Sequence, residues 1–262
     1  ELYPPLAITG RRPLEGLTYA MPIASAQVKS AILLAGLSSR APVTVVEPSS
    51  TRDHTERLLQ RLGASVHRDG RAVTLEPVMR PLRAPGRLTV PGDPSSAAFF
   101  VVAAAIVPGS QVTIEGVGLN PSRTHFLTIL RRMGASIQEE RRDDWEPQGS
   151  LAVEGSALRA VTVGADEVPL VIDELPALMA AAALAQGTSR FEALAELRVK
   201  ETDRLQSMLS GLSRMGASIE AIGASGLRIT GGPLRGAAVD SFGDHRTVMS
   251  LAVAGLAAAG ET

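Results

Sequence analysis

One stretch of the chain, Phe126-Leu127-Thr128-Ile129-Leu130-Arg131-Arg132-Met133-Gly134-Ala135-Ser136, shows a pattern that occurs three times. Its apolar side chains recur at helical spacing, and the run ends at a Gly-Ala-Ser tripeptide. The same tripeptide begins at Gly63 and at Gly216, each time after another amphipathic stretch. A glycine just beyond the last apolar residue is typical of a helix end. The chain is therefore built from an internal repeat.

An Ala-rich and more uniformly apolar segment precedes each amphipathic helix, and we expect a buried helix there. These segments are Ser25–Leu37, Ser95–Val107 and Leu175–Ala185. A turn and a short strand follow each segment, and further β-rich residues follow each Gly-Ala-Ser tripeptide. Each repeat therefore predicts a buried helix, a strand, an amphipathic helix and two strands. Helices that alternate with strands in this way indicate a mixed α/β class, with three buried helices inside a shell of sheet and outer helix.

A segment rich in Pro and Arg, Pro81–Pro91, separates the first repeat from the second. We interpret it as a domain boundary, with a first domain over residues 1–90 and a second over residues 91–262. A fourth copy begins at Phe242–Arg246 with a helix over residues 247–258, and it stops at Thr262 where its strand should start. We therefore expect a chain that is truncated at both ends, with one domain incomplete.

The composition favours a soluble globular protein, with 45% apolar and 20% charged residues among 262. A formal net charge of −1 and an aromatic content of 3% disfavour nucleic-acid and membrane partners. The chain has no cysteine, which excludes disulfides and thiolate sites from it and fits a cytoplasmic location. The four histidines show no familiar metal-site spacing, so we predict no metal.

Polar side chains that do not fit a core gather at the predicted helix starts. They include Ser25, Gln27 and Lys29; Asp93, Ser95 and Ser96; Asp173 and Glu174; and Gly243 to Arg246. The amphipathic helices also begin with charge, and Arg52 and Arg123 occupy equivalent positions in their repeats. Helix N-termini bind anions, and Arg grips phosphate or carboxylate through paired hydrogen bonds. The pattern therefore suggests a ligand that carries both groups.

The most informative stretch is Arg198-Val199-Lys200-Glu201-Thr202-Asp203-Arg204. If a helix starts near Lys200, Arg204 lies one turn along from both Lys200 and Glu201. A carboxylate held between two cations beside a bound anion is suited to proton transfer. The alternative is an exposed helix start with ordinary ion pairs, and the pattern alone leaves both open.

Structural explanations also exist for the other polar residues. Asp93, Ser25 and Asp173 each fit a helix cap, and for Asp173 the pattern alone favours the cap. Gln27 and Lys29 fit surface positions. Arg123 and His125 fit structural or surface positions better than ligand positions, and His67 fits the solvent side of a strand.

Six motifs, in this order along the chain, resemble the 3-phosphoshikimate 1-carboxyvinyltransferase (EPSP synthase) family. They are Ser25–Ser30, Thr51–Glu56, Pro91–Ala97, Ile172–Pro176, Leu197–Leu205 and Asp244–Arg246. The resemblance covers Met21 to Thr262. It implies an inside-out α/β barrel of repeated βαβαββ units in two domains that close over an active site. It also implies transfer of the enolpyruvyl group from phosphoenolpyruvate to the 5-hydroxyl of shikimate 3-phosphate, without a cofactor.

The resemblance also implies a role for each matching residue. Ser25, Ala26, Gln27 and Arg52 would bind shikimate 3-phosphate, and Lys200 would contact it as well. Asp173 would act on the attacking hydroxyl, and Glu201 would transfer a proton at the methylene carbon of phosphoenolpyruvate. The anionic groups of phosphoenolpyruvate would be held by Arg204 and Arg246, with His245 lining the same pocket.

The chain departs from the family pattern in several places. The family's N-terminal Lys-Ser and Arg motif, its Asn-X-Gly segment and its C-terminal lysine are absent, and Glu196 stands where many members have Asn. We therefore expect this chain alone to be inactive or nearly so. The resemblance further implies a shikimate-pathway enzyme of the cytoplasm that is a glyphosate target and a monomer at full length. A non-catalytic anion-binding fragment and a UDP-N-acetylglucosamine enolpyruvyl transferase remain as alternatives.

Overall fold

A computed structural model of the chain describes residues 5, 7–10, 13–84, 86–142 and 144–262. Its internal contacts divide the chain into two compact units, Glu1–Thr89 and Val90–Thr262, here called unit one and unit two. The division falls within the Pro- and Arg-rich segment Pro81–Pro91. Residues 1–4, 6, 11–12 and 85 of the expected first domain lie outside the described residues.

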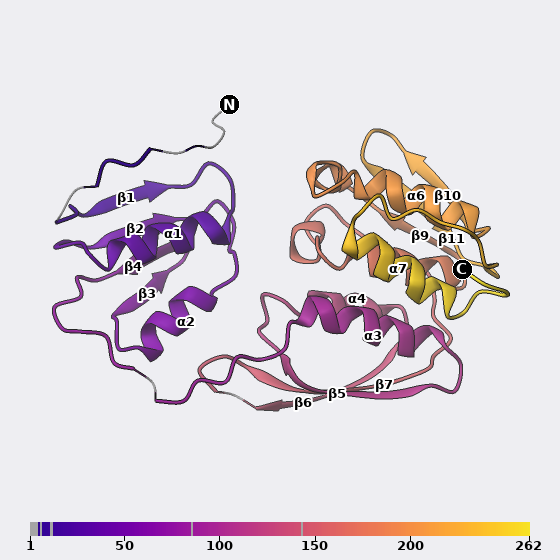
Figure 1. The fold of residues 1–262 in the computed structure, drawn as a ribbon, viewed down its shortest axis with the longest axis horizontal. Coiled ribbons are helices and arrows are strands. Elements are labelled where there is room, and N and C mark those ends of the chain that lie inside the picture. The colour runs from indigo at the N-terminus through magenta and orange to yellow at the C-terminus, as the bar shows by residue number, and fades with distance from the viewer. Residues whose placement is uncertain (1–4, 6, 11–12, 85, 143) are drawn as a thin grey trace. The chain divides into compact units, whose positions relative to one another are not determined.

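Unit one contains one complete copy of the predicted repeat (Figure 1). Its elements are β1 (Leu17–Ala20), α1 (Ala26–Gly36), β2 (Val43–Val46), α2 (His54–Arg61), β3 (Val66–Asp69) and β4 (Ala72–Leu75). The strands form one sheet in the order β1-β2-β4-β3. The β1–β2 pair is parallel because α1 crosses between its strands, and the other two pairs are antiparallel.

Unit two contains two further copies and the start of another. Its first copy has α3 (Pro94–Ile106), β5 (Gln111–Gly118), α4 (His125–Arg132), β6 (Ser136–Arg142) and β7 (Gln148–Glu154). The second has β8 (Thr162–Val163), the 3₁₀ helix η1 (Val168–Leu170), α5 (Leu175–Leu184), β9 (Thr188–Phe191), the 3₁₀ helix η2 (Leu194–Val199), α6 (Arg204–Arg214), β10 (Ser218–Ile222) and β11 (Gly226–Thr230). The chain then enters α7 (His245–Gly255). The sheets run β5-β7-β6 and β10-β11-β9-β8, so every copy keeps the same strand order.

Three helices form the centre of unit two, of which α3 and α5 are predicted buried helices and α7 takes the place expected for the first, Ser25–Leu37. Helices α3, α5 and α7 pack against one another, and the two sheets lie on opposite sides of them (Figure 1). Residues Leu175 to Ala183 of α5 are all buried, which is the expected result for a helix that is apolar on every face. This arrangement places helices inside and sheets outside, the inverse of an ordinary barrel. Among the described helices, none combines the length and the apolar character that crossing a bilayer needs.

Helix α1 of unit one differs from these central helices. Only Lys29, Leu33 and Gly36 of α1 are buried, while Val28 and Leu34 are 43% and 51% exposed. The prediction of a helix buried on all sides is therefore wrong for α1, because within the described part of unit one no second central helix packs against it. The prediction of Lys29 as a surface residue is also wrong, since Lys29 is 0% exposed.

The Gly-Ala-Ser tripeptides end the amphipathic helices as predicted. Gly63, Gly134 and Gly216 have φ angles of +91°, +93° and +87°, in the left-handed region that favours glycine. In each copy the glycine and the following alanine donate their N–H groups back to the last helical turn, for example from Ala135 to the Leu130 carbonyl at 3.0 Å. These are the paired bonds of a Schellman motif. The repeated tripeptide is thus a repeated helix stop.

We predict that Gly134→Ala lowers the free energy of unfolding by about 1 kcal/mol, because an L-residue is strained at this φ. A Cβ at Gly134 would meet only the Ala157 carbonyl oxygen at 3.7 Å, so the loss reflects the backbone and not a clash. The measurement is urea unfolding. Gly232→Ala is the control, since Gly232 has no positive φ and its Cβ would meet nothing within 4 Å. Equal stability of Gly134→Ala and wild type would contradict the account.

Candidate active site

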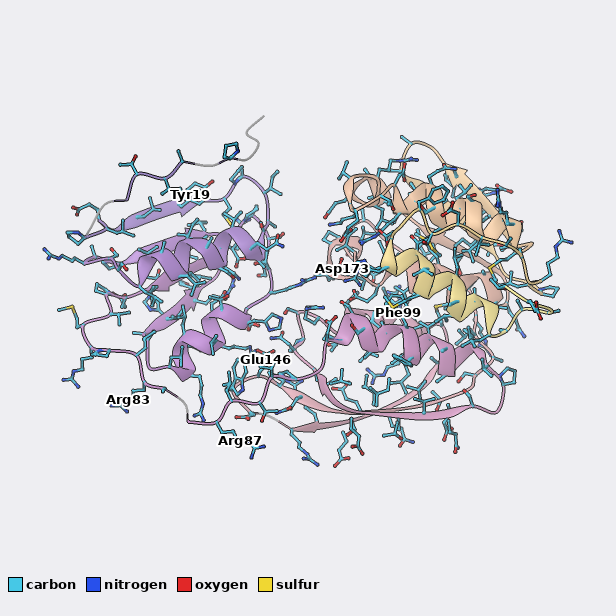
Figure 2. The ribbon with its side chains drawn as sticks, viewed as in Figure 1. Tyr19, Arg83, Arg87, Phe99, Glu146 and Asp173 are labelled. Atoms are coloured by element: carbon cyan, nitrogen blue, oxygen red, sulfur yellow. The ribbon has the colours of Figure 1, made fainter. Side chains whose placement is uncertain are left out.

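The beginnings of three helices in unit two meet around one carboxylate, Asp173, which Figure 2 labels. Asp173 lies just before α5, and its Oδ1 is 3.9 Å from Nη1 of Arg204, the first residue of α6. The same oxygen is 3.8 Å from Nε of Arg246, near the start of α7. Nη1 of Arg246 also donates a 3.0 Å hydrogen bond to the Asp173 backbone oxygen. The structure therefore brings together three side chains that lie far apart in the sequence.

Arg204 is buried and its direction is fixed by Asp244. The Arg204 side chain is 1% exposed, and its Nε donates a 2.8 Å hydrogen bond to Oδ2 of Asp244. Asp244 also caps α7, since its Oδ1 accepts the N–H groups of Arg246 and Thr247 at 2.8 and 3.1 Å. Burial raises the pKa of Asp244, but the Arg204 guanidinium and these N–H groups outweigh that effect and hold its pKa below the usual value. Asp244 is thus the ionised anchor of the site.

Glu201 contacts Arg204 from the solvent side. Its Oε2 accepts a hydrogen bond from Nη2 of Arg204, and its side chain is 57% exposed. The prediction that a helix begins near Lys200 is wrong, because Asp203 caps α6 by accepting the Gln206 N–H at 2.9 Å. Glu201 therefore lies in the segment before the helix, where its side chain is less constrained than a helical one.

Lys200 and His245 stand apart from this group in the structure. Lys200 is partly buried and forms an ion pair with Oε1 of Glu196. Its predicted role needs a rotation of the side chain away from Glu196. His245 is the first residue of α7, and it is exposed. We call Asp173, Glu201, Arg204 and Arg246 the Asp173 group. Lys200 and His245 lie next in sequence to members of this group, but the structure does not bring them into it.

A second carboxylate, which the sequence analysis noted at a helix start but gave no role in the site, lies beside Asp173. Glu174 is 3% exposed, and its Oε1 accepts a hydrogen bond from the Ser95 hydroxyl at the start of α3. Nη2 of Arg123 donates to the same hydroxyl at 2.6 Å and pairs with Asp93 at 2.9 Å. Burial raises the pKa of Glu174, and the charge of Asp173 adds to this, against the opposing effects of Ser95 and Arg123. The network ties α3 to the residue that follows Asp173.

The cap predictions have mixed outcomes. Ser25 caps α1 by accepting the Val28 N–H at 3.3 Å, and Asp93 caps α3, as predicted. The cap interpretation of Asp173 is wrong, because Glu174 occupies the N-cap position of α5 and makes no side-chain cap bond there. The sequence does contain a signal for the burial of Glu174, because this residue lies between Asp173 and a wholly apolar helix. A carboxylate buried there needs a hydrogen-bond partner.

The other predicted binding residues lie in unit one. Ser25 and Ala26 are partly buried at the start of α1, and Gln27 is exposed beside them. Arg52 is partly buried in the loop between β2 and α2. These residues occupy a helix N-terminus and an adjoining loop, which is the expected setting for binding a phosphate group.

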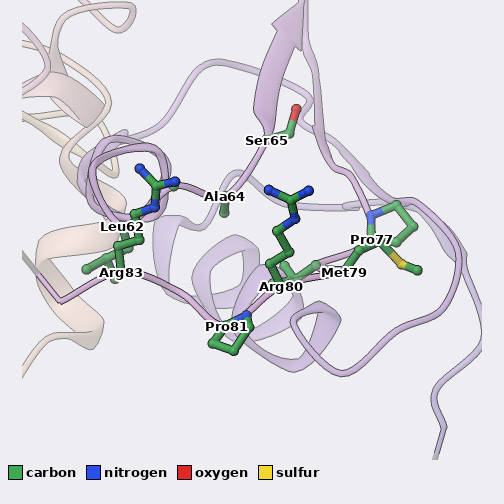
Figure 3. A pocket seen from close by; sticks show the side chains of 10 residues that line it. Leu62, Ala64, Ser65, Pro77, Met79, Arg80, Pro81 and Arg83 are labelled. Carbon is green, nitrogen blue, oxygen red and sulfur yellow. The ribbon is translucent and has the colours of Figure 1, made fainter.

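Unit one also contains a pocket of about 450 Å³ that is separate from the predicted binding residues (Figure 3). It is lined by residues of the segments 62–65 and 77–83, including Arg80 and Arg83. It lies where the Gly63 helix stop meets the segment that leaves the sheet, and none of the predicted site residues lines it. We assign the pocket no role, because none of the residues that the sequence motifs indicate contributes to its lining.

The Asp173 group has the charges that anionic substrates and proton transfer require. Arg204 and Arg246 supply two guanidinium groups that can each grip a carboxylate or a phosphate. Asp173 and Glu201 supply two carboxylates beside them, one held by Arg246 and the other exposed. Among the described residues, no three His, Asp or Glu side chains gather as a metal site.

We predict that Glu174→Gln changes how stability depends on pH. Because the folded-state pKa of Glu174 is raised, its contribution to stability is fully present below the unfolded value of about 4.3 and is lost as pH rises through the folded value. The variant has no such loss, so it should gain stability relative to wild type as pH rises from about 4 to 7. Urea unfolding across this range measures the difference. Glu220→Gln, at a side chain that is 64% exposed, is the control. Parallel curves for wild type and Glu174→Gln would contradict the burial account.

Comparison with known proteins shows the family to which the chain belongs. The family model for EPSP synthase (3-phosphoshikimate 1-carboxyvinyltransferase) matches residues 1–262. A 3-phosphoshikimate 1-carboxyvinyltransferase of Geobacter sulfurreducens is 50% identical over 260 residues, which cover 98% of this chain and 59% of that protein. The corresponding protein of a Synechocystis strain is 47% identical over 270 residues, covering 99% and 58%.

Solved structures agree with the sequence comparison. An EPSP synthase structure from Acinetobacter baumannii matches with a TM-score of 0.88 at 43% identity, over 94% of this chain and 57% of that one. The chain thus spans a little under 60% of the length of the relatives it matches. It belongs to the EPSP synthase (3-phosphoshikimate 1-carboxyvinyltransferase) family.

Proposed function

We propose that this chain carries active-site groups of an enzyme that transfers the enolpyruvyl group from phosphoenolpyruvate to the 5-hydroxyl of shikimate 3-phosphate, with release of phosphate. The observation that carries the proposal is the convergence of Asp173, Arg204 and Arg246 at the beginnings of three helices. Family membership supports it, because relatives of greater length bear the name of this activity.

In this proposal, phosphoenolpyruvate binds to Arg204 and Arg246, with His245 beside them. Nη2 of Arg204 is bound to Glu201 in the structure, so a substrate that uses this nitrogen replaces Glu201. Glu201 is the partner that can be replaced, because it is exposed and precedes the helix, whereas Asp244 is buried and caps α7. An incoming carboxylate or phosphate would then take the place of Glu201 on Arg204. Glu201 would turn toward the methylene carbon of the substrate.

The chemistry is an addition followed by an elimination. Glu201 donates a proton to the methylene carbon, which leaves a cation-like centre at the carbon that bears the phosphate. The 5-hydroxyl oxygen attacks that centre, and Asp173 accepts or orients its proton. Phosphate then leaves, and the carboxylate of Glu201 that the first step produced takes back a proton from the new methyl group, which restores the double bond. Fixed charges that are shielded from water stabilise such charged intermediates more strongly than exposed charges do.

Shikimate 3-phosphate binds in this proposal to Ser25, Ala26, Gln27 and Arg52, with Lys200 contributing after it leaves Glu196. The free N–H groups at the start of α1 and the Arg52 guanidinium suit its phosphate. We further propose that the enzyme needs neither a metal nor an organic cofactor. We also propose that it acts as a monomer at full length in the cytoplasm.

We predict that shikimate 3-phosphate raises the melting temperature of the chain, because a ligand that binds only the folded state stabilises it. UDP-N-acetylglucosamine at the same concentration should leave it unchanged. Arg52→Gln should remove most of the shift in melting temperature, since it deletes the guanidinium group that we propose to bind the phosphate. Differential scanning fluorimetry makes the measurement.

Two outcomes would contradict this prediction. A shift with the UDP-sugar and none with shikimate 3-phosphate would favour the sister transferase. An equal shift with inorganic phosphate alone would favour a fragment that binds anions without recognising the substrate.

A further inference from the structure

A cluster of four charged side chains, three of them buried, joins α1, α2, β3 and the loop after β2 in unit one. Lys29 in α1 is 0% exposed, and its Nζ lies 2.6 Å from Oε1 of Glu56 in α2 and 3.2 Å from Oε1 of Glu47, just after β2. Nη2 of Arg68 in β3 lies 2.7 Å from Oε2 of Glu47 and 3.5 Å from Oε1 of Glu56. The buried Lys29, Glu47 and Glu56 and the partly exposed Arg68 therefore balance one another in charge, which lowers the cost of burying the first three.

Stability alone does not account for this cluster. Removing ions from water costs several kcal/mol per ion, and well-packed apolar residues of similar volume often serve stability as well or better. The apolar core of unit one is small, built around Leu33, Val45, Leu59, Val73 and Leu75. The best-attested use of such buried charges is to specify a single arrangement.

The arrangement that the cluster specifies is that of the β2–α2 loop. Oε1 of Glu47 accepts the backbone N–H of Thr51 at 3.1 Å and also the Thr51 hydroxyl. Burial raises the pKa of Glu47, but the bonds from Thr51 and Arg68 and the charge of Lys29 outweigh it, so its pKa lies below the usual value. Glu47 thus remains an ionised acceptor. It fixes the residue that immediately precedes Arg52.

The same cluster is anchored to the start of α1. The Lys29 N–H donates to the Ser25 carbonyl at 3.0 Å, so Lys29 closes the first turn of the helix that Ser25 caps. The hydroxyls of Ser30 and Thr55 form a second link of 2.7 Å between the beginnings of α1 and α2. One set of buried contacts therefore holds both segments that carry Ser25, Gln27 and Arg52.

We propose that the Lys29–Glu47–Glu56–Arg68 cluster positions Ser25, Gln27 and Arg52 for binding of the phosphorylated substrate. The proposal rests on the proposed function of these three residues as the shikimate 3-phosphate site. The four members of the cluster are positioning residues and need not touch the substrate. Their contribution is preorganisation, since a loop that is held in its binding conformation loses less entropy when the ligand binds.

The test compares charge-balanced variants by calorimetric titration with shikimate 3-phosphate. Lys29→Met with Glu47→Leu removes one charge of each sign and the acceptor of Thr51, and leaves the Arg68–Glu56 pair. We expect affinity to fall about tenfold while the protein stays folded. Lys29→Met with Glu47→Gln keeps an acceptor for Thr51 and should recover most of the affinity. A merely structural role would not produce this difference.

Hydrogen exchange supplies a second readout. The Thr51 amide should exchange faster in the Lys29→Met/Glu47→Leu variant and remain slow in the Lys29→Met/Glu47→Gln variant. His67→Gln is the matched control, because it breaks only an exposed 3.9 Å contact with Glu76 in the same sheet and should alter neither readout. If the Leu variant does not fold, Thr51→Ala deletes one bond to Glu47 and should weaken binding about threefold.

The outcomes separate this proposal from the one on which it rests. No binding of shikimate 3-phosphate by the wild-type chain would overturn the assignment of the substrate site. Binding by wild type that is unchanged in a folded Leu variant, or in Thr51→Ala, would overturn the positioning role and leave the substrate site intact.

Discussion

The buried pair of Arg204 and Asp244 is the interaction on which the candidate site depends. Asp244 caps α7 with one oxygen and binds Arg204 with the other, so the start of α7 fixes the first residue of α6. Arg204 in turn faces Asp173 ahead of α5. Breaking a buried pair by removing one partner leaves an uncompensated charge, which is strongly destabilising. The pair therefore sets the relative positions of the three helix beginnings before any substrate binds.

Both units contain a buried cation that is held by carboxylates. In unit two a buried Arg is held by the cap residue of a neighbouring helix, and in unit one a buried Lys is held by two carboxylates near the next helix. In unit two the buried cation is itself proposed to bind an anionic substrate, whereas in unit one it lies near residues proposed to do so. In unit two the pair joins the start of an amphipathic helix, α6, to the start of α7, the first helix of the next copy.

The sequence predicted the repeat and its order of elements well, because glycine stops and apolar periodicity are local signals. It was wrong about Lys29, since a lysine near a helix start looks like a surface residue unless its partners are known. Those partners, Glu47 and Glu56, are brought to it only by folding. The helix start near Lys200 was misplaced for a similar reason, because Glu201 and Asp203 are equally plausible in a first turn and the cap bond decides between them.

The candidate site was predictable in part. Asp173, Arg204 and Arg246 were named from motifs, and the structure places them together. The contact of Glu174 with Ser95 was not predicted, although both were noted as polar residues at helix starts, because it joins residues that are 79 positions apart. One sequence contains no local pattern that indicates which single buried polar groups pair over a long range.

The most direct test of the central claim is a crystal structure of the protein with shikimate 3-phosphate and phosphoenolpyruvate. The account predicts oxygens of phosphoenolpyruvate within about 3 Å of the guanidinium groups of Arg204 and Arg246, with Asp244 still bound to Arg204 and Glu201 displaced. Phosphoenolpyruvate bound elsewhere, with the Arg204–Glu201 contact intact, would contradict it.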